Sequence, residues 1–171
     1  FRRSSLMVTA ILICTSSLAW GQSIGVIVEA ELKSGEQVIL GRAHRSAYDY
    51  RLNEYTFDEI PKPGSVKQIK GLEQLPALKR LYVDRIDYLG NLTWMRGLET
   101  LSVVVFNESL LPDIKGLFRS RSLNIAFLVN CKFRGVPPRV IDLRGAPNLE
   151  AIYLSGTCLE SVPEFRNTPE S

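Results

Sequence analysis

The residue types that could do chemistry are few in this chain. Its only histidine is His44, in the segment GRAHRS, and the chain has three cysteines. Acid–base catalysis needs a base that is placed beside a partner group, and no such partner is evident near His44 in the sequence. We therefore expect His44 to be a surface residue.

The other candidates for chemistry have simpler interpretations. Cys131 could act as a nucleophile, but a lone cysteine in an apolar repeat is typical of a small buried side chain. Asp84 and Asp87 resemble the start of a calcium loop, although no further ligands follow them. The chain also lacks C-x-x-C, H-E-x-x-H and phosphate-binding glycine motifs. We expect a protein that is not an enzyme and that has no cofactor and no metal site.

Composition limits the remaining functions. The chain has 171 residues, of which 45% are hydrophobic and 23% charged, as expected for one ordinary globular domain. Its formal net charge is +3, and without Arg2 and Arg3 the balance is 19 basic against 18 acidic residues, or +1. This charge does not favour a nucleic-acid partner.

The first 21 residues have the layout of a secretory signal peptide. Arg2 and Arg3 precede an uncharged run from Leu6 to Ala19, and Ala19-Trp20-Gly21 provides small residues before a cleavage site. We expect residues 1–21 to be removed, which leaves no stable membrane span and indicates a secreted, periplasmic or cell-envelope protein. A buried core segment and a retained anchor are the alternatives, although the run is short of the ~20 residues that span a bilayer.

Residues 22–46 are predicted to form an N-terminal β-hairpin that caps the domain. Val26, Val28 and Ala30 alternate with other residues, a turn follows at 33–36, and an apolar strand returns at 38–40. An isolated hairpin is only marginally stable, so it must pack on another part of the chain.

The rest of the chain repeats. Segments with similar apolar spacing begin at Leu78, Leu98, Leu123 and Leu149, and are 20, 25 and 26 residues apart. A proline closes three of them, at Pro112, Pro137 and Pro163. Repeats of this length cannot bury their apolar face alone, so they are expected to stack.

This pattern resembles the leucine-rich repeat family, L-x-x-L-x-L-x-x-N/C-x-L followed by a proline. The clearest matches are LNIAFLVNCKFRGVP (Leu123 to Pro137) and LEAIYLSGTCLESVP (Leu149 to Pro163), and the resemblance covers Leu78 to Pro163. The ninth position departs from the family, because it holds Ile86, Phe106, Cys131 and Thr157. The hydrogen-bonded ladder at this position is therefore expected to be incomplete.

The resemblance implies an α/β solenoid over residues 47–171, with about four to five repeats and a polar tail from about 164. Each repeat contributes one short parallel strand, and the convex side is irregular or has short helices, as at 62–71 and 113–118. Leu81 and Val83, and Ala126 and Leu128, are among the pairs expected to point into the core.

The concave strand face is the expected binding surface. Its residues are those that alternate with the core positions: Arg80, Tyr82, Asp84, Ser102, Val104, Ile125, Phe127, Val129, Tyr153 and Ser155. An apolar patch beside aromatic residues is typical of contact surfaces. The alternative is that the hairpin, or the segment 48–50, folds over the patch and makes it part of the core.

Cys131 and Cys158 are expected to lie in neighbouring repeats, with their Cα atoms roughly 6 Å apart. An oxidising compartment makes a disulfide possible there, although side-chain direction favours two free thiols.

The expected function is thus a non-catalytic, exported leucine-rich-repeat module that binds a protein or another macromolecular ligand. The alternative is a structural surface element that self-associates. This alternative depends on the strand at 151–155, which would leave an open edge if only a polar tail followed it.

Overall fold

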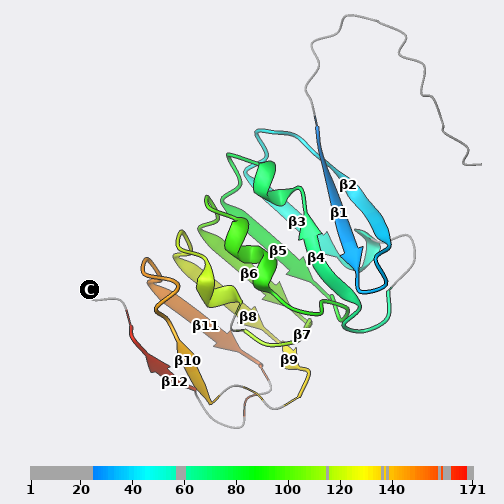
Figure 1. The fold of residues 1–171 in the computed structure, drawn as a ribbon. Helices are drawn as coiled ribbons and strands as arrows, with labels where there is room; N and C mark the ends of the chain where they lie inside the picture. Colours follow the sequence, from blue (N-terminus) through cyan, green and yellow to red (C-terminus); the bar gives the residue numbers. More distant parts are fainter. Residues whose placement is uncertain are drawn as a thin grey trace, which may run out of the picture.

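The chain winds into a β-solenoid of about three turns, with parallel strands and little helix (Figure 1). The computed structural model describes residues 25–56, 61–114, 116–135, 137, 139–157, 159 and 163–168. The expected signal peptide, residues 1–21, lies outside these residues. No helix in the part of the chain that the structure describes has the length and apolar character needed to cross a membrane.

One layer of the solenoid is a five-stranded parallel sheet. Its strands, in spatial order, are β11 (Ala151–Ser155), β8 (Ile125–Val129), β6 (Val103–Asn107), β5 (Arg80–Asp84) and β3 (Asp49–Asn53). All neighbours pair in register over five residues. Alternate side chains point into the solenoid, and the predicted inward residues Leu81, Val83, Ala126 and Leu128 are fully buried.

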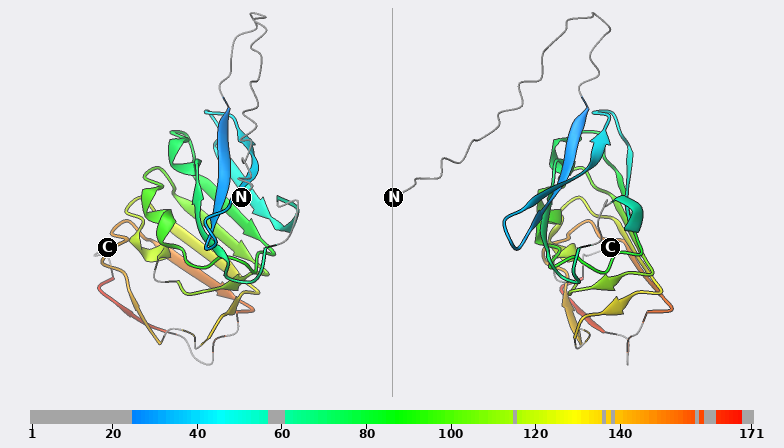
Figure 2. Two further views of the ribbon diagram at one scale, coloured as in Figure 1. Left: turned by 45° about the vertical axis from the view of Figure 1, so that its right-hand side comes forward. Right: turned by 90° about the vertical axis from the view of Figure 1, so that its right-hand side faces the viewer.

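The opposite layer consists of short, irregular elements (Figure 2). It contains the 3-10 helices η2 (Leu72–Gln74), η3 (Thr93–Gly97) and η4 (Leu117–Arg119), whereas η1 (Glu54–Thr56) follows β3. Two short parallel pairs complete the turns, β7 (Leu110–Leu111) with β9 (Lys132–Phe133), and β10 (Val140–Asp142) with β12 (Glu164–Arg166). The α/β description is therefore too helical, because 3-10 turns are the only helices among the described residues.

The N-terminal end of the solenoid carries an antiparallel sheet. β1 (Val26–Leu32) pairs with β2 (Gln37–Ala43) on one side and with β4 (Val66–Lys70) on the other. Val28, Ala30 and Val66 are fully buried in this sheet. The expected helix at 62–71 is wrong, because the free edge of β1 recruits residues 66–70 as a strand.

The predicted polar tail from about 164 contains a strand, β12. β12 pairs in parallel with β10, and its Phe165 is half-buried against the core. The polar residues on either side of Phe165 point outward and are exposed, as the alternation of side chains in a strand requires. The tail is therefore polar on its outer side and extends the opposite layer.

The second repeat has a different register from the predicted one. β6 pairs Val103 with Arg80 and with Ile125, so Leu101, not Leu98, is the equivalent of Leu78 and Leu123. Val104 and Phe106 therefore point into the core and are fully buried, and Val103 points outward. In-register pairing with strands on both sides outweighs the apolar spacing of the isolated segment.

The new register places Ser109 at the ninth position of the second repeat, where Phe106 was predicted. Ser109 is buried, and its hydroxyl accepts the N–H of Ile86 at 3.0 Å and donates to the carbonyl of Asn107 at 2.9 Å. In the next repeat, the Cys131 thiol lies 3.5 Å from the carbonyl oxygen of Phe106. The interior ladder is thus more complete than the sequence indicated.

Candidate binding face

The outer surface of the parallel sheet is the largest regular array of side chains in the described structure. We call this surface the sheet face. Because the strands pair in register, its side chains form three rows that cross all five strands. The rows are Asp49, Arg80, Val103, Ile125 and Ala151; Arg51, Tyr82, Val105, Phe127 and Tyr153; and Asn53, Asp84, Asn107, Val129 and Ser155.

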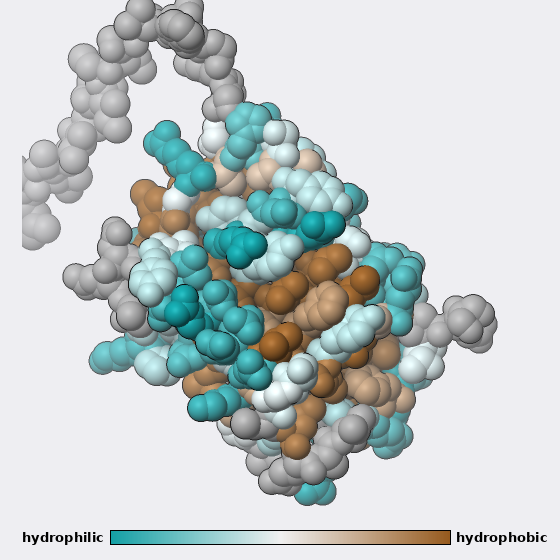
Figure 3. Space-filling model, turned by 180° about the vertical axis from the view of Figure 1, so that it is seen from behind, coloured by the Kyte–Doolittle hydropathy of each residue, from teal (hydrophilic) through white to brown (hydrophobic). Residues whose placement is uncertain are grey.

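The middle of the sheet face is apolar. Val103, Val105, Ile125, Phe127 and Val129 come from β6 and β8, and each of these hydrophobic side chains is only partly buried. Figure 3 looks onto this side of the molecule and shows hydrophobic side chains in a band across its middle, with hydrophilic ones beside them. Five apolar neighbours on two adjacent strands form one continuous patch.

An aromatic pair borders the patch on the β11 side. The rings of Phe127 and Tyr153 are stacked with their centroids 4.6 Å apart and their planes at 9°. Tyr153 is 51% exposed. A tyrosine in this position offers a rigid apolar ring together with a hydroxyl group that can form a hydrogen bond.

Arginine–tyrosine contacts border the patch on the β3 side. The guanidinium of Arg51 lies 4.5 Å from the ring centre of Tyr82, its in-register neighbour, and Arg80 lies 5.3 Å from the ring of Tyr48. Contacts of this kind hold the planar guanidinium over the ring while its N–H groups stay available at the edge. The sheet face therefore has a polar end, with charges of both signs, next to its apolar middle.

Acidic side chains at the strand ends hold neighbouring turns together. Asp84 accepts a hydrogen bond from the side-chain amide of Asn107 at 2.7 Å, and Asp87 accepts the backbone N–H of Leu110 at 3.0 Å. These contacts account for the Asp84 and Asp87 pair that resembled a calcium loop. The described residues contain no group of three or more metal-binding side chains.

The structure brings the predicted face residues together except Ser102 and Val104. Val104 is fully buried, and Ser102 precedes β6 and donates its hydroxyl hydrogen to the Asn124 side-chain oxygen at 3.2 Å. The shifted register replaces them with Val103, Val105 and Asn107, which sequence reasoning missed. Three consecutive valines at 103–105 gave no alternation from which the correct face could be read.

The segments that were considered as covers for the patch have other positions. β1 and β2 belong to the antiparallel sheet at the N-terminal end, and Tyr48 precedes β3, where it contacts Arg80. Tyr50 lies on the inner side of β3, and burial raises its pKa to about 12. Neither of these segments therefore covers the outward side chains of β6 and β8.

Cys131 is a free, buried cysteine. Its thiol lies 3.4 Å from the carbonyl oxygen of Val129, and burial raises the pKa of the thiol above its usual value. A buried thiol with a raised pKa is a poor nucleophile at neutral pH. Cys158, its predicted neighbour, lies outside the described residues, so the expected closeness of the two cysteines stays a prediction.

His44 lies at an exposed turn, where its ring contacts the hydroxyl of Ser46. The backbone N–H of Ser46 also donates to the His44 Nδ1 at 3.2 Å, and Ala47 N–H donates to the His44 carbonyl at 2.8 Å. These local hydrogen bonds stabilise the turn between β2 and β3. His44 is thus a surface residue, as the sequence predicts.

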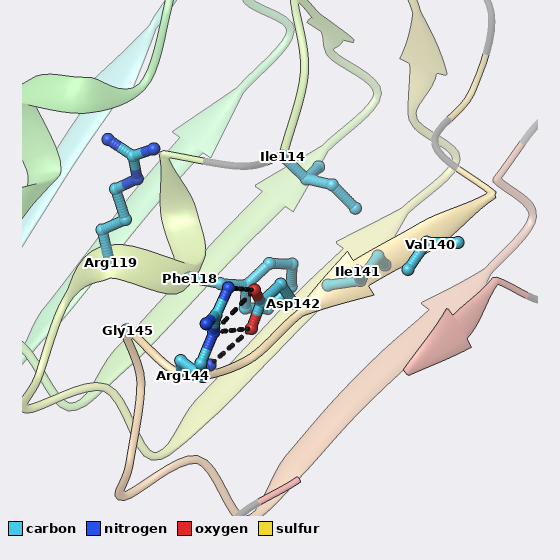
Figure 4. Close-up of a pocket in the computed structure, with 8 residues that line it drawn as sticks. All are labelled: Ile114, Phe118, Arg119, Val140, Ile141, Asp142, Arg144 and Gly145. Atoms are coloured by element: carbon cyan, nitrogen blue, oxygen red, sulfur yellow. Dashed lines mark hydrogen bonds and ion pairs between the residues drawn. The ribbon is translucent and has the colours of Figure 1, made fainter. Parts of the chain in front are cut away.

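A small pocket of about 340 Å³ opens between η4 and β10 (Figure 4). Ile114, Phe118 and Ile141 give it an apolar wall, and the Asp142 carboxylate beside them is bonded to Arg144 Nε at 2.9 Å and to Arg144 Nη2 at 2.6 Å. These bonds hold the pKa of Asp142 well below its usual value. The pocket thus has an apolar wall with one paired, ionised carboxylate beside it.

Comparisons of the chain with models of protein families, with curated proteins and with solved structures found no match.

Proposed function

We propose that this chain is an exported leucine-rich-repeat protein that binds a protein partner through its sheet face and catalyses no reaction. The observation that carries the proposal is the continuous patch of Val103, Val105, Ile125, Phe127 and Val129, whose side chains are only partly buried on the outer side of a regular sheet. The repeat pattern, the N-terminal layout and the near-neutral charge of the mature chain support the same interpretation.

The apolar area of the patch and the rigidity of its backbone both favour binding. Burying the exposed part of an apolar side chain contributes about 25 cal/mol per Å², and five neighbouring side chains can be covered by one partner surface. Because these side chains project from paired strands, their backbone does not need to be ordered on binding. A preformed surface avoids part of the entropy cost of association.

The two borders of the patch provide directional contacts. Tyr153 is stacked on Phe127, and Arg51 is held over Tyr82. Tyrosine and arginine are the residue types that contribute most to binding at protein interfaces. We therefore expect the apolar middle to contribute most of the binding free energy, and the borders of the patch to add hydrogen bonds and ion pairs with the partner.

Site-specific photocrosslinking tests the proposal. A benzoylphenylalanine in place of Val105 lies in the middle of the patch, and the same residue in place of Ile39 lies on β2, away from the parallel sheet. Ile39 is 64% exposed, so it is a control for non-specific capture. With the extracellular fraction of the source cells, we expect one discrete crosslinked protein from position 105 and none from position 39.

The substitution Phe127→Ser removes an aromatic ring from the patch and should weaken binding of the partner. Its partly buried ring, stacked on Tyr153, should contribute about 2 kcal/mol to the free energy of unfolding, less than the ~5–15 kcal/mol of a typical domain, so we expect the variant to stay folded and the crosslink at position 105 to weaken. Equal crosslinking from positions 105 and 39, or a crosslink that Phe127→Ser leaves unchanged, would overturn the proposal.

A further inference from the structure

The strand β10 is paired along only one of its edges in the described structure. The carbonyl of Arg139 accepts an N–H of β12 at 2.8 Å, and the N–H of Leu143 donates to a carbonyl of β12 at 3.0 Å. In a parallel pair, alternate residues bond to the same neighbour, so the backbone groups of Val140 and Asp142 point away from β12. No described residue forms a hydrogen bond with these N–H and C=O groups.

The open edge of β10 faces the pocket of about 340 Å³ between η4 and β10, which we call the β10 pocket (Figure 4). This pocket lies between two consecutive turns of the solenoid, and β12 occupies the other edge of β10. At this level the described part of the preceding turn contributes η4 and not a strand, so β10 has no strand partner on the pocket side.

The two ends of the β10 pocket differ in chemistry. Ile114 and Val140 lie at one end, and Arg119 and Arg144 lie at the other (Figure 4). A Cβ atom at Gly145 would lie 2.9 Å from the Cα atom of Arg119, so the glycine allows the two turns to close together at the arginine end. The β10 pocket is therefore apolar at one end and lined by arginines at the other.

The arginine end favours an anionic group. Asp142 is bonded to Nε and Nη2 of Arg144, and it also accepts the side-chain amide of Asn167 at 3.0 Å. Arg119 is exposed and forms no ion pair with any described residue. Two guanidinium groups and one carboxylate leave a net charge of +1 at this end. Arg119 and the Nη1 group of Arg144 can therefore bind a further carboxylate.

We propose that the β10 pocket binds a short free peptide in an extended conformation, with an apolar residue at the Ile114 end and its C-terminal carboxylate at Arg119. The peptide runs parallel to β10, because the chain direction from Val140 to Asp142 leads from the apolar end to the arginine end. In this pairing one peptide residue donates its N–H to the Val140 carbonyl and accepts the Asp142 N–H.

The size and the backbone of the pocket both favour this ligand. Small-molecule sites span ~300–1,000 Å³, so a volume of about 340 Å³ admits a peptide of about two or three residues. The three residues of β10 offer pairing groups over a similar length. An apolar acid without peptide groups could use the same walls, but it would leave the inward backbone groups of Val140 and Asp142 unpaired.

Titration of the ¹⁵N-labelled full chain with the tripeptide acetyl-Leu-Val-Ala, followed by NMR, tests the proposal. We expect saturable shifts of the Val140 and Asp142 amide signals at millimolar peptide. The same peptide with a C-terminal amide should bind about tenfold more weakly, because it lacks the charge that the arginines bind. A methyl group on the valine nitrogen of the peptide should have a similar effect, because it removes the donor to the Val140 carbonyl.

Two matched variants test the role of the arginine end. Arg119→Gln should weaken peptide binding about fivefold or more, whereas Arg96→Gln, at an exposed arginine of η3 in the preceding turn, should leave it unchanged. Both side chains are exposed, so both variants should fold.

The proposal is overturned by the absence of saturable shifts, or by shifts that leave out Asp142. Equal binding of the free and amidated peptides, or equal effects of Arg119→Gln and Arg96→Gln, would also contradict it. The sheet face lies on the other layer of the solenoid, so none of these outcomes depends on its proposed partner.

Discussion

Two neighbouring valines provide a direct test of the register of the second repeat. Val104 is fully buried and Val103 is only partly buried on the sheet face, whereas the apolar spacing of the sequence predicts the reverse. Val104→Ala removes two methyl groups from the core, worth about 1.6 kcal/mol by transfer, and leaves a cavity that raises the loss to about 2–3 kcal/mol. Val103→Ala removes the same atoms from a surface that is partly wet, so its cost should be less than about 1 kcal/mol.

Equilibrium unfolding in urea measures both variants, with the half-buried Trp94 of η3 as a fluorescent probe. Each variant should keep the wild-type slope of free energy against urea, because the surface that unfolding exposes hardly changes. The quantity of interest is the difference between the two losses in the free energy of unfolding. Both variants replace a valine of β6 by alanine, so the change in strand propensity is the same in both. A Val103→Ala variant that is as destabilised as Val104→Ala, or more, would refute the register.

Three further predictions concern single side chains. Ser109→Ala leaves the buried N–H of Ile86 without an acceptor, so the free energy of unfolding should fall by about 1–3 kcal/mol in the same urea assay; an unchanged midpoint would contradict the ladder. Hydrogen bonds from Lys67, Lys70 and Gln68 lower the pKa of Glu31 to about 2 from 4.5, so its contribution is complete above pH 4.5 and is lost as the pH falls toward 2. An acid titration of stability should therefore be shallower for Glu31→Gln between pH 4.5 and 2, and equal curves would exclude the effect. Cys131 should react with a chromogenic disulfide reagent only when the chain is unfolded, because it is buried and burial raises its thiol pKa. If the native wild-type chain has one more rapidly reacting thiol than the native Cys131→Ser variant, Cys131 is not buried.

The solenoid and its parallel strands were predictable because two kinds of signal coincide in the sequence. In β5 the charged residues Arg80 and Asp84 alternate with Leu81 and Val83, so these two have only one face on which to be buried. β8 is apolar throughout, and its inward residues Ala126 and Leu128 follow from the leucine spacing of its repeat. The repeated length then requires the neighbouring strands to stack in parallel, and the prediction for both strands is correct.

The second repeat shows where this reasoning fails. Leu98 and Leu101 are both buried, and three valines follow in a row, so either leucine can begin an apolar repeat. The sequence of the segment alone does not distinguish the two choices. Pairing decides between them, because Val103 lies in register with both Arg80 and Ile125 only when Leu101 begins the repeat.

Residues 62–71 show a second kind of failure. Their lysines and glutamine are compatible with a helix, and the sequence between two strands of a repeat often forms one. β1 has an unpaired edge, however, and Ala30 pairs with Ile69, so the segment becomes a strand that closes the N-terminal end. The Glu31 carboxylate then accepts hydrogen bonds from Lys67 and Gln68, whose side chains lie across the strand pair. The partner of this strand is more than thirty residues away, which no local pattern can reveal.

The register error changes the proposed site, because side chains in a strand alternate between faces. In the predicted register, Ser102 interrupts the apolar patch and Val104 belongs to it. In the structure, Val103 and Val105 both face outward and join Ile125 and Phe127 without interruption. The polar Asn107 moves to the border, where it binds Asp84. A shift of one residue along β6 therefore turns a broken patch into a continuous one, and the argument for a binding face is stronger for the structure than for the sequence.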